Sequence, residues 1–201
     1  ITPFPGGSPL LKPGLLEPER VRNEALASFA VAAVIGLYLT WRASPWILAV
    51  GVAGILSAYL YTATLAPAGL GEFFLFLDFG PLMVLGAWLV QTGRLTWDPI
   101  WASLPVAFLI MNVLWINQFP DAPADDAVGK RHWVVRLGRR RALLIYGGLF
   151  LATYLALGVN VLTDVGPIWT LLGLLPLPLA WRAGRIARRH YNEPSQLRPA
   201  N

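Results

Sequence analysis

Long segments of this chain contain no Asp, Glu, Lys or Arg. An uncharged helix of about 17–25 residues can span a hydrocarbon core of roughly 30 Å. The segments lack the alternation of barrel strands, and in lipid a helix satisfies its own backbone hydrogen bonds. The sequence therefore predicts an all-α fold, a polytopic transmembrane helical bundle.

We predict six membrane helices in a single membrane-embedded domain over residues 1–201. The turns between them carry proline, glycine or charge, as helix ends in membranes usually do. Only the third predicted helix contains a charged residue, Asp78. The predicted helices are Ala25–Trp41, Pro45–Ala63, Phe73–Val90, Pro99–Phe119, Ala142–Thr163 and Gly166–Trp181.

Composition excludes several classes of protein. A content of 56% hydrophobic and 13% charged residues excludes a disordered chain and argues against an ordinary soluble domain. The absence of cysteine excludes disulfides, thiolate nucleophiles and Cys-ligated metals. The net charge of +5 does not indicate nucleic acid, because the cations flank the apolar segments. The predicted partner is the lipid bilayer.

The cations are distributed unequally between the two sides of the predicted bundle. If the helices alternate in direction, one side carries every Lys and Arg except Arg42 and Arg94. The positive-inside rule makes that side cytoplasmic. We therefore predict a multi-pass protein of the cell inner or plasma membrane.

Acids and bases are concentrated in the stretch Asn117–Gly138, NQFPDAPADDAVGKRHWVVRLG, directly after one of the most apolar segments. Asn117, Asp121 and Asp125 recur every four residues, so on a continuous helix they would share one face. Asp126 would point about 100° away and face solvent.

Two prolines complicate a continuous helix in this stretch. Proline breaks a helix interior but is tolerated in a first turn. We therefore predict that the fourth membrane helix ends near Phe119. A short new helix would run from Pro120 to about Val128, with Gly129 as its C-terminal cap.

Two carboxylates one helical turn apart can bind a hard cation. Mg²⁺ prefers one or two protein carboxylates, with water and phosphate oxygens in its remaining positions. Lys130 and Arg131 follow closely and could hold the same phosphates. The alternative interpretation is a charged loop that only orients the protein in the membrane.

Other polar residues leave their roles open. Asp78 lies inside a predicted membrane helix, where it either lines a cavity or is a hydrogen-bonded packing residue. His132 and His190 lie in basic stretches without zinc-binding spacing, which favours interfacial histidines. A basic helix end that anchors topology and attracts anionic lipid is formed by Arg182, Arg185, Arg188 and Arg189.

The stretch from Asn117 resembles the second Asp-rich motif of the UbiA-type intramembrane aromatic prenyltransferases, with Asp121 and Asp125 as its acid pair. Further segments resemble the family in the same order along nearly the whole chain. Two of them, GLGEFF and FGPLMVLGAWLVQTG, resemble the branch that prenylates 1,4-dihydroxy-2-naphthoate in menaquinone biosynthesis. The others are TPFPGGSPLL, YLYTA and HYNEPSQLRPAN.

The resemblance implies about nine helices around a cavity, with Mg²⁺ bridging two Asp-rich motifs to a polyprenyl diphosphate. It also implies that the metal and cations stabilise the departing diphosphate, and that an electron-rich aromatic acceptor attacks the allylic carbocation. The roles carried over are Mg²⁺ binding by Asp121 and Asp125, support by Asn117, diphosphate binding by Lys130 and Arg131, and a place near the reacting centre for Tyr61.

The chain departs from the family pattern in three places. It contains no N-D-x-x-D motif. The expectation is that the first two helices and the last helix are missing, and that this segment alone is inactive. Thr64–Gly71 is shorter than its family counterpart and lacks cations, and Asp78 stands where an apolar or small residue is expected.

Several alternatives remain beside a naphthoate prenyltransferase. In the same family the acceptor could be 4-hydroxybenzoate, homogentisate or a glyceryl phosphate. A small transporter would use Asp78 and Asp121 as coupling sites, but the chain shows no pair of similar halves. An inactive membrane scaffold is the other rival. The sequence predicts neither prenyl length nor oligomeric state.

Overall fold

The computed structural model describes residues 17–193 and residue 197, and this part of the chain contains helices and no strands. The amino-terminal TPFPGGSPLL and most of the carboxy-terminal tail lie outside the described residues. The α-helices are α1 (Pro18–Arg42), α2 (Trp46–Leu60), α3 (Gly71–Leu77), α4 (Met83–Thr92), α5 (Asp98–Ala127), α6 (Trp133–Leu162) and α7 (Leu177–His190). Two π-helical segments, η1 (Tyr61–Leu65) and η2 (Asp78–Leu82), and a 3₁₀ segment, η3 (Ile168–Leu174), complete the fold.

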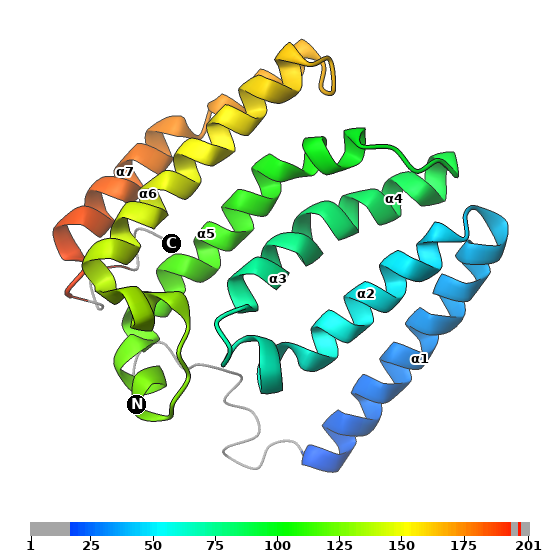
Figure 1. The fold of residues 1–201 in the computed structure, drawn as a ribbon, viewed down its shortest axis with the longest axis horizontal. Helices are drawn as coiled ribbons and strands as arrows, with labels where there is room; N and C mark the ends of the chain where they lie inside the picture. The colour runs from blue at the N-terminus through cyan, green and yellow to red at the C-terminus, as the bar shows by residue number, and fades with distance from the viewer. Residues whose placement is uncertain (1–16, 194–196, 198–201) are drawn as a thin grey trace.

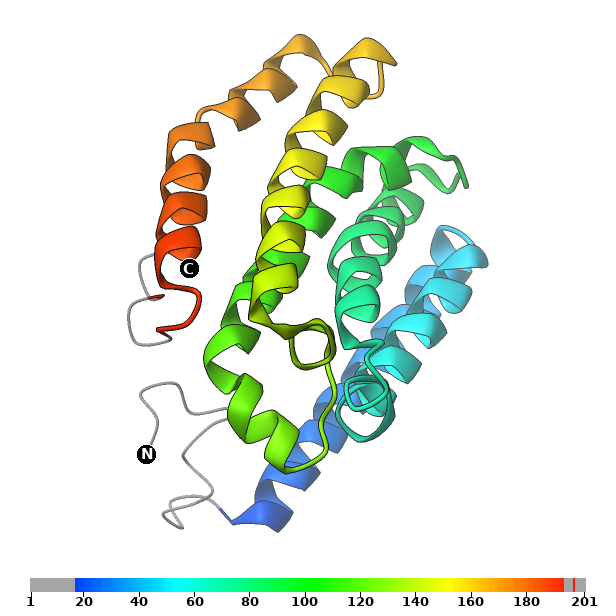
Figure 2. The same ribbon diagram turned by 60° about the vertical axis from the view of Figure 1, so that its left-hand side comes forward.

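Helices α3 and α4 continue one another through η2, and this rod and the helices α1, α2, α5 and α6 run alternately up and down beside one another in chain order (Figure 1). The α5–α6 pair makes the most extensive contact between helices. Figure 2 shows α7 on the outer side of α6, running antiparallel to it. The α2–α3 and α5–α6 connections lie at the same end of the bundle as the carboxy-terminal end of α7.

Four helical stretches are long and apolar enough to cross a membrane: Pro18–Arg42, Gly71–Thr92, Asp98–Ala127 and Trp133–Leu162. The shorter apolar helix α2 lies between the first two. The first five predicted membrane helices fall on these stretches and on α2. The prediction of a polytopic helical bundle is confirmed.

The sixth predicted membrane helix, Gly166–Trp181, is wrong. The structure divides this segment into η3 and the beginning of α7, which starts after Pro176. Proline lacks the N–H that a helix interior needs, but it fits a helix start, and Pro178 lies in the first turn of α7. The apolar run therefore breaks, and α7 extends to His190 through the basic residues that follow.

A buried cluster joins α5, α6 and α7. Trp115 and Phe119 of α5 pack with Tyr146 of α6 and with Ala187 of α7. The Trp115 indole Nε1 donates a hydrogen bond of 2.9 Å to the carbonyl of Ala142. Burying an indole requires such a partner, so this bond fixes the register of α5 against α6.

Asp78 begins the π-helical segment η2 and accepts a hydrogen bond from Ser57 Oγ of α2 at 2.5 Å. Its second oxygen, Oδ1, is buried without a hydrogen-bond partner among the described residues. Of the two interpretations that the sequence leaves open, the structure favours a hydrogen-bonded packing residue between neighbouring helices.

We predict that Gly80→Val destabilises the protein. A Cβ at Gly80 would collide with the backbone and Cβ of Ala107 on α5, so η2 and α5 would have to separate. Overpacking of this kind costs about 1–3 kcal/mol, measurable as thermal unfolding in detergent by tryptophan fluorescence. Gly51→Val, where a Cβ meets no atom within 4 Å, is the control. Equal melting temperatures for the two variants would contradict the prediction.

Candidate functional site

Helix α5 continues to Ala127 through Pro120 and Pro123, so the predicted break after Phe119 is wrong. Proline at 123 cannot donate to the carbonyl four residues earlier, which belongs to Phe119. The Arg139 guanidinium replaces that donor with a hydrogen bond of 3.1 Å to the Phe119 carbonyl. A side chain from α6 thus compensates for a backbone donor that α5 lacks.

Continuity of α5 places the predicted polar residues on one helical face. Asn117, Asp121 and Asp125 succeed one another at intervals of one turn and are all half-buried. Asp126 is exposed, as predicted. The Asp121 carboxylate makes no hydrogen bond or ion pair with a residue that the structure describes. The face therefore presents two carboxylates one turn apart at the end of α5.

Gly129 caps α5, as predicted, with a positive φ of 77° that glycine adopts readily. The Gly129 N–H donates to the carbonyl of Asp126 at 3.0 Å, and the Lys130 N–H donates to that of Asp125 at 2.9 Å. These two bonds form a Schellman motif, which satisfies carbonyls that the helix end leaves free. The cap turns the chain so that Lys130 and His132 return toward Asp125.

Two side chains lie close to the Asp125 carboxylate. Lys130 Nζ lies 3.0 Å and His132 Nε2 lies 3.2 Å from the same carboxylate oxygen, Oδ2. Burial lowers the pKa of His132, although the carboxylates of Asp125 and Glu72 oppose the shift. The imidazole is therefore neutral at neutral pH, and Lys130 provides the charge that balances Asp125. Both contacts use Oδ2 of the carboxylate.

Glu72 is the residue of this region that sequence reasoning missed. Only 1% of it is exposed, and its Oε1 accepts hydrogen bonds from Gln118 Nε2 at 2.9 Å and from the backbone N–H of Trp133 at 3.2 Å. Glu72 thereby joins the starts of α3 and α6 to the end of α5. The available signal was an acid inside the apolar run GLGEFF. Acids in such positions are costly to bury and are kept by specific partners.

Arg136 holds the connection after α5 against the connection after α2. Its guanidinium donates to the carbonyls of Ala68 at 2.8 Å and Arg131 at 2.5 Å, and it lies 5.6 Å from the centroid of the Trp133 ring. Arg131 itself is exposed. Arg136 therefore links the α5–α6 connection to the α2–α3 connection at the end of the bundle that carries the acid pair.

Tyr61 begins η1, where α2 ends, and is half-buried. A Cβ on Gly71 would lie 3.4 Å from its hydroxyl, so the ring packs against the start of α3, next to Glu72. In the described part of the chain, no hydrogen bond or ion pair joins Tyr61 to Asp121 or Asp125. Tyr61 thus lies at the same end of the bundle as the acid pair without touching it.

The acid pair fits part of a metal site. Among the described residues, no third His, Cys, Asp or Glu joins Asp121 and Asp125 in a group that could hold an ion by itself. Mg²⁺ needs only one or two protein carboxylates when phosphate and water oxygens complete its shell. The donor set of α5 therefore fits a divalent cation that is shared with a phosphorylated ligand.

Comparison with known proteins identifies the architecture to which this site belongs. The model of the UbiA prenyltransferase family matches residues 15–199. The chain belongs to this family. UbiA family prenyltransferases are generally metal-dependent, which agrees with the donor set on α5. No solved structure matches the chain significantly.

Several curated relatives of this UbiA family chain have names that contain a naphthoate or a naphthoquinone. This chain is 36% identical over 177 residues to the 1,4-dihydroxy-2-naphthoate octaprenyltransferase of Mycobacterium tuberculosis. The alignment covers 87% of this chain and 60% of that protein. The enzyme of the same name from Bacillus subtilis is 26% identical, with 86% and 56% covered. The 2-carboxy-1,4-naphthoquinone phytyltransferase of Synechocystis is 30% identical, with 84% and 57% covered. The chain thus spans somewhat more than half the length of these relatives.

We predict that Glu72→Ala loosens the joint between α3, α5 and α6. The substitution leaves the buried Gln118 amide and the Trp133 N–H without their acceptor. Each buried donor left unsatisfied costs about 1–3 kcal/mol, which thermal unfolding in detergent measures. Asp126→Ala, at an exposed acid of the same region, is the control and is expected to change stability by less than about 0.5 kcal/mol. An unchanged melting temperature for Glu72→Ala would rule out this joint.

Proposed function

We propose that the protein containing this chain transfers a polyprenyl group from a polyprenyl diphosphate to an aromatic acceptor, and that the acceptor is 1,4-dihydroxy-2-naphthoate. The observation that carries the proposal is the Asp121–Asp125 pair on a continuous helix, directly followed by the capped turn that returns Lys130 to it. The names of the naphthoate-specific relatives support the choice of acceptor.

In this proposal Asp121 and Asp125 hold Mg²⁺, and Asn117 supports them from one turn earlier. The bound Mg²⁺ would neutralise negative charge that develops on the diphosphate as its bond to the allylic carbon breaks. The protein needs only to position the reactants and to stabilise this charge. Two carboxylates suit this role together with a second Asp-rich motif of the full-length protein, because the diphosphate supplies further oxygen ligands.

Lys130 and Arg131 would bind the diphosphate. The Lys130 ammonium lies 3.0 Å from Asp125 Oδ2. From this position it would also neutralise negative charge on the departing diphosphate. Arg131 is exposed, and its guanidinium offers two parallel donors to phosphate oxygens. Tyr61 would lie near the reacting carbon, where the acceptor ring attacks.

The acid pair would face the cytoplasm, where soluble diphosphates and Mg²⁺ are available. The connections that carry Lys130 and Arg131 lie at the same end of the bundle as the basic end of α7 (Figures 1 and 2). The opposite end carries the turns at Arg42 and Arg94. This distribution supports a cytoplasmic position by the positive-inside rule.

We predict that Asp121→Asn or Asp125→Asn in the full-length protein lowers turnover by about 100-fold or more, because each removes a charge from the metal site. Turnover is measured in membranes with labelled polyprenyl diphosphate and 1,4-dihydroxy-2-naphthoate, with and without Mg²⁺. Chelation is expected to abolish turnover, and added Mg²⁺ to restore it.

Asp126→Asn is the matched control for this prediction, since it changes the same residue type on the exposed face of the same turn. It is expected to retain full turnover. If Asp121→Asn retained full turnover, the metal assignment would be wrong. If wild-type protein instead used 4-hydroxybenzoate, homogentisate or a glyceryl phosphate in place of the naphthoate, the acceptor assignment would be wrong while the acid pair kept its role.

A further inference from the structure

A groove of about 450 Å³ runs between α6 and α7 and belongs to neither the acid pair nor its connections. Ligand sites commonly have volumes of about 300–1,000 Å³. The α6 wall is formed by Gly147, Phe150, Leu151 and Tyr154, and the α7 wall by Leu177, Ala180, Trp181, Gly184, Arg185 and Arg188.

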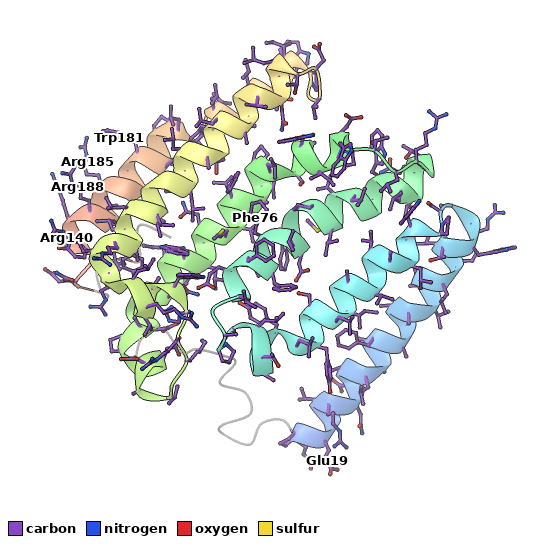
Figure 3. The ribbon with its side chains drawn as sticks, viewed as in Figure 1. Glu19, Phe76, Arg140, Trp181, Arg185 and Arg188 are labelled. Atoms are coloured by element: carbon purple, nitrogen blue, oxygen red, sulfur yellow. The ribbon has the colours of Figure 1, made fainter. Side chains whose placement is uncertain are left out.

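The groove is apolar at one end and cationic at the other. Because α6 and α7 are antiparallel, Tyr154 and Leu177 lie toward one end, and Gly147 and Arg188 lie toward the other. Figure 3 shows Trp181, Arg185 and Arg188 in a row along α7. Their spacing of four and three residues places them on one helical stripe. A ligand that fits both ends must be a long hydrocarbon with an anionic head.

The charge at the cationic end has no counter-ion in the described structure. Neither Arg185 nor Arg188 forms an ion pair or hydrogen bond with a described residue, and both are exposed. The sequence has no Asp or Glu between Asp164 and Glu193. Arg140 adds a further exposed guanidinium near the start of α6, at the same end of the bundle.

Two glycines keep the groove open. A Cβ added to Gly147 or to Gly184 would meet no atom within 4 Å, so neither glycine is required for close helix packing. Helix α7 enters the buried core near its carboxy-terminal end through Ala187, which is fully buried. Over the preceding turns, α6 and α7 also line a larger cavity of about 800 Å³ together with α5, and this cavity shares Phe150, Tyr154 and Ala180 with the groove.

We propose that this groove binds an anionic glycerophospholipid of the surrounding bilayer. One acyl chain lies against Phe150, Leu151 and Leu177, and the phosphate is bound by Arg185 and Arg188. Guanidinium groups bind phosphate through paired hydrogen bonds, and basic residues beside a membrane helix attract anionic lipid. Trp181, which is exposed, lies between the two ends, where an indole favours the boundary between hydrocarbon and headgroups.

The bound lipid seats α7 against α6. The groove is not assigned to a polyprenyl diphosphate, because no carboxylate lines it and the acid pair lies on α5. A zwitterionic lipid carries its own cation beside the phosphate and gains less from two uncompensated arginines. The proposal thus concerns a lipid site that is separate from the proposed catalytic acids.

The test uses the full-length protein in detergent, with native mass spectrometry to count bound lipid and thermal unfolding to measure stabilisation. Phosphatidylglycerol is expected to bind one equivalent and to raise the melting temperature, whereas phosphatidylcholine is not. Arg185→Gln with Arg188→Gln is expected to weaken phosphatidylglycerol binding by about tenfold or more, since charged hydrogen bonds are lost. The matched control is Arg22→Gln with Arg141→Gln, which removes the same charge at exposed positions that do not line the groove.

A second pair of variants tests the groove without altering charge. Gly147→Leu fills it and is expected to exclude the acyl chain, while Gly158→Leu, also in open space on α6 but outside the groove, is expected to leave binding unchanged. Equal loss in both charge variants would overturn the site, and so would full retention of lipid by Gly147→Leu. If stoichiometric polyprenyl diphosphate displaced the lipid, the lipid site would also be overturned, because the groove would then belong to the diphosphate.

Discussion

Every backbone polar group inside a bilayer needs a partner, and the end of α5 meets this requirement in an unusual way. Pro123 removes the donor that the Phe119 carbonyl would use, and Arg139 of α6 supplies it from outside the helix. Gly138, with a φ of 74°, kinks α6 immediately before Arg139. The bond between Arg139 and Phe119 therefore couples the bend of one helix to the continuity of another.

The acid pair depends on that continuity. If α5 ended at Phe119, Asp121 and Asp125 would belong to a separate short helix, free to turn relative to the bundle. On the continuous helix their direction is set by the packing of Trp115 and Phe119 deeper in the core. The proposed metal site would depend on this rigidity, because carboxylates held in place lose little entropy when an ion and its phosphate ligand bind.

Buried polar bonds complete the same end of the bundle. Glu72 joins three helices, and Arg136 ties the connection after α5 to the connection after α2. The neutral His132 and the charged Lys130 share one oxygen of Asp125. These contacts explain how a segment rich in charge can be ordered at the end of a largely apolar bundle. Arg185 and Arg188 of α7 form no such bond with a described residue, and there the proposed partner is lipid.

The helical membrane architecture, the spacing of Asp121 and Asp125 by one helical turn, and the cap at Gly129 could all be predicted from the sequence. These follow from local properties: apolar length, helical period and the freedom of glycine at positive φ. Whether α5 continues through Pro123 depends on the tertiary structure, since the compensating donor, Arg139, lies on another helix. The tertiary structure also decided the break before α7 and the burial of Glu72. Local rules give the free-energy cost of a proline in a helix or of a buried acid. Only the packed bundle shows which distant side chain offsets that cost.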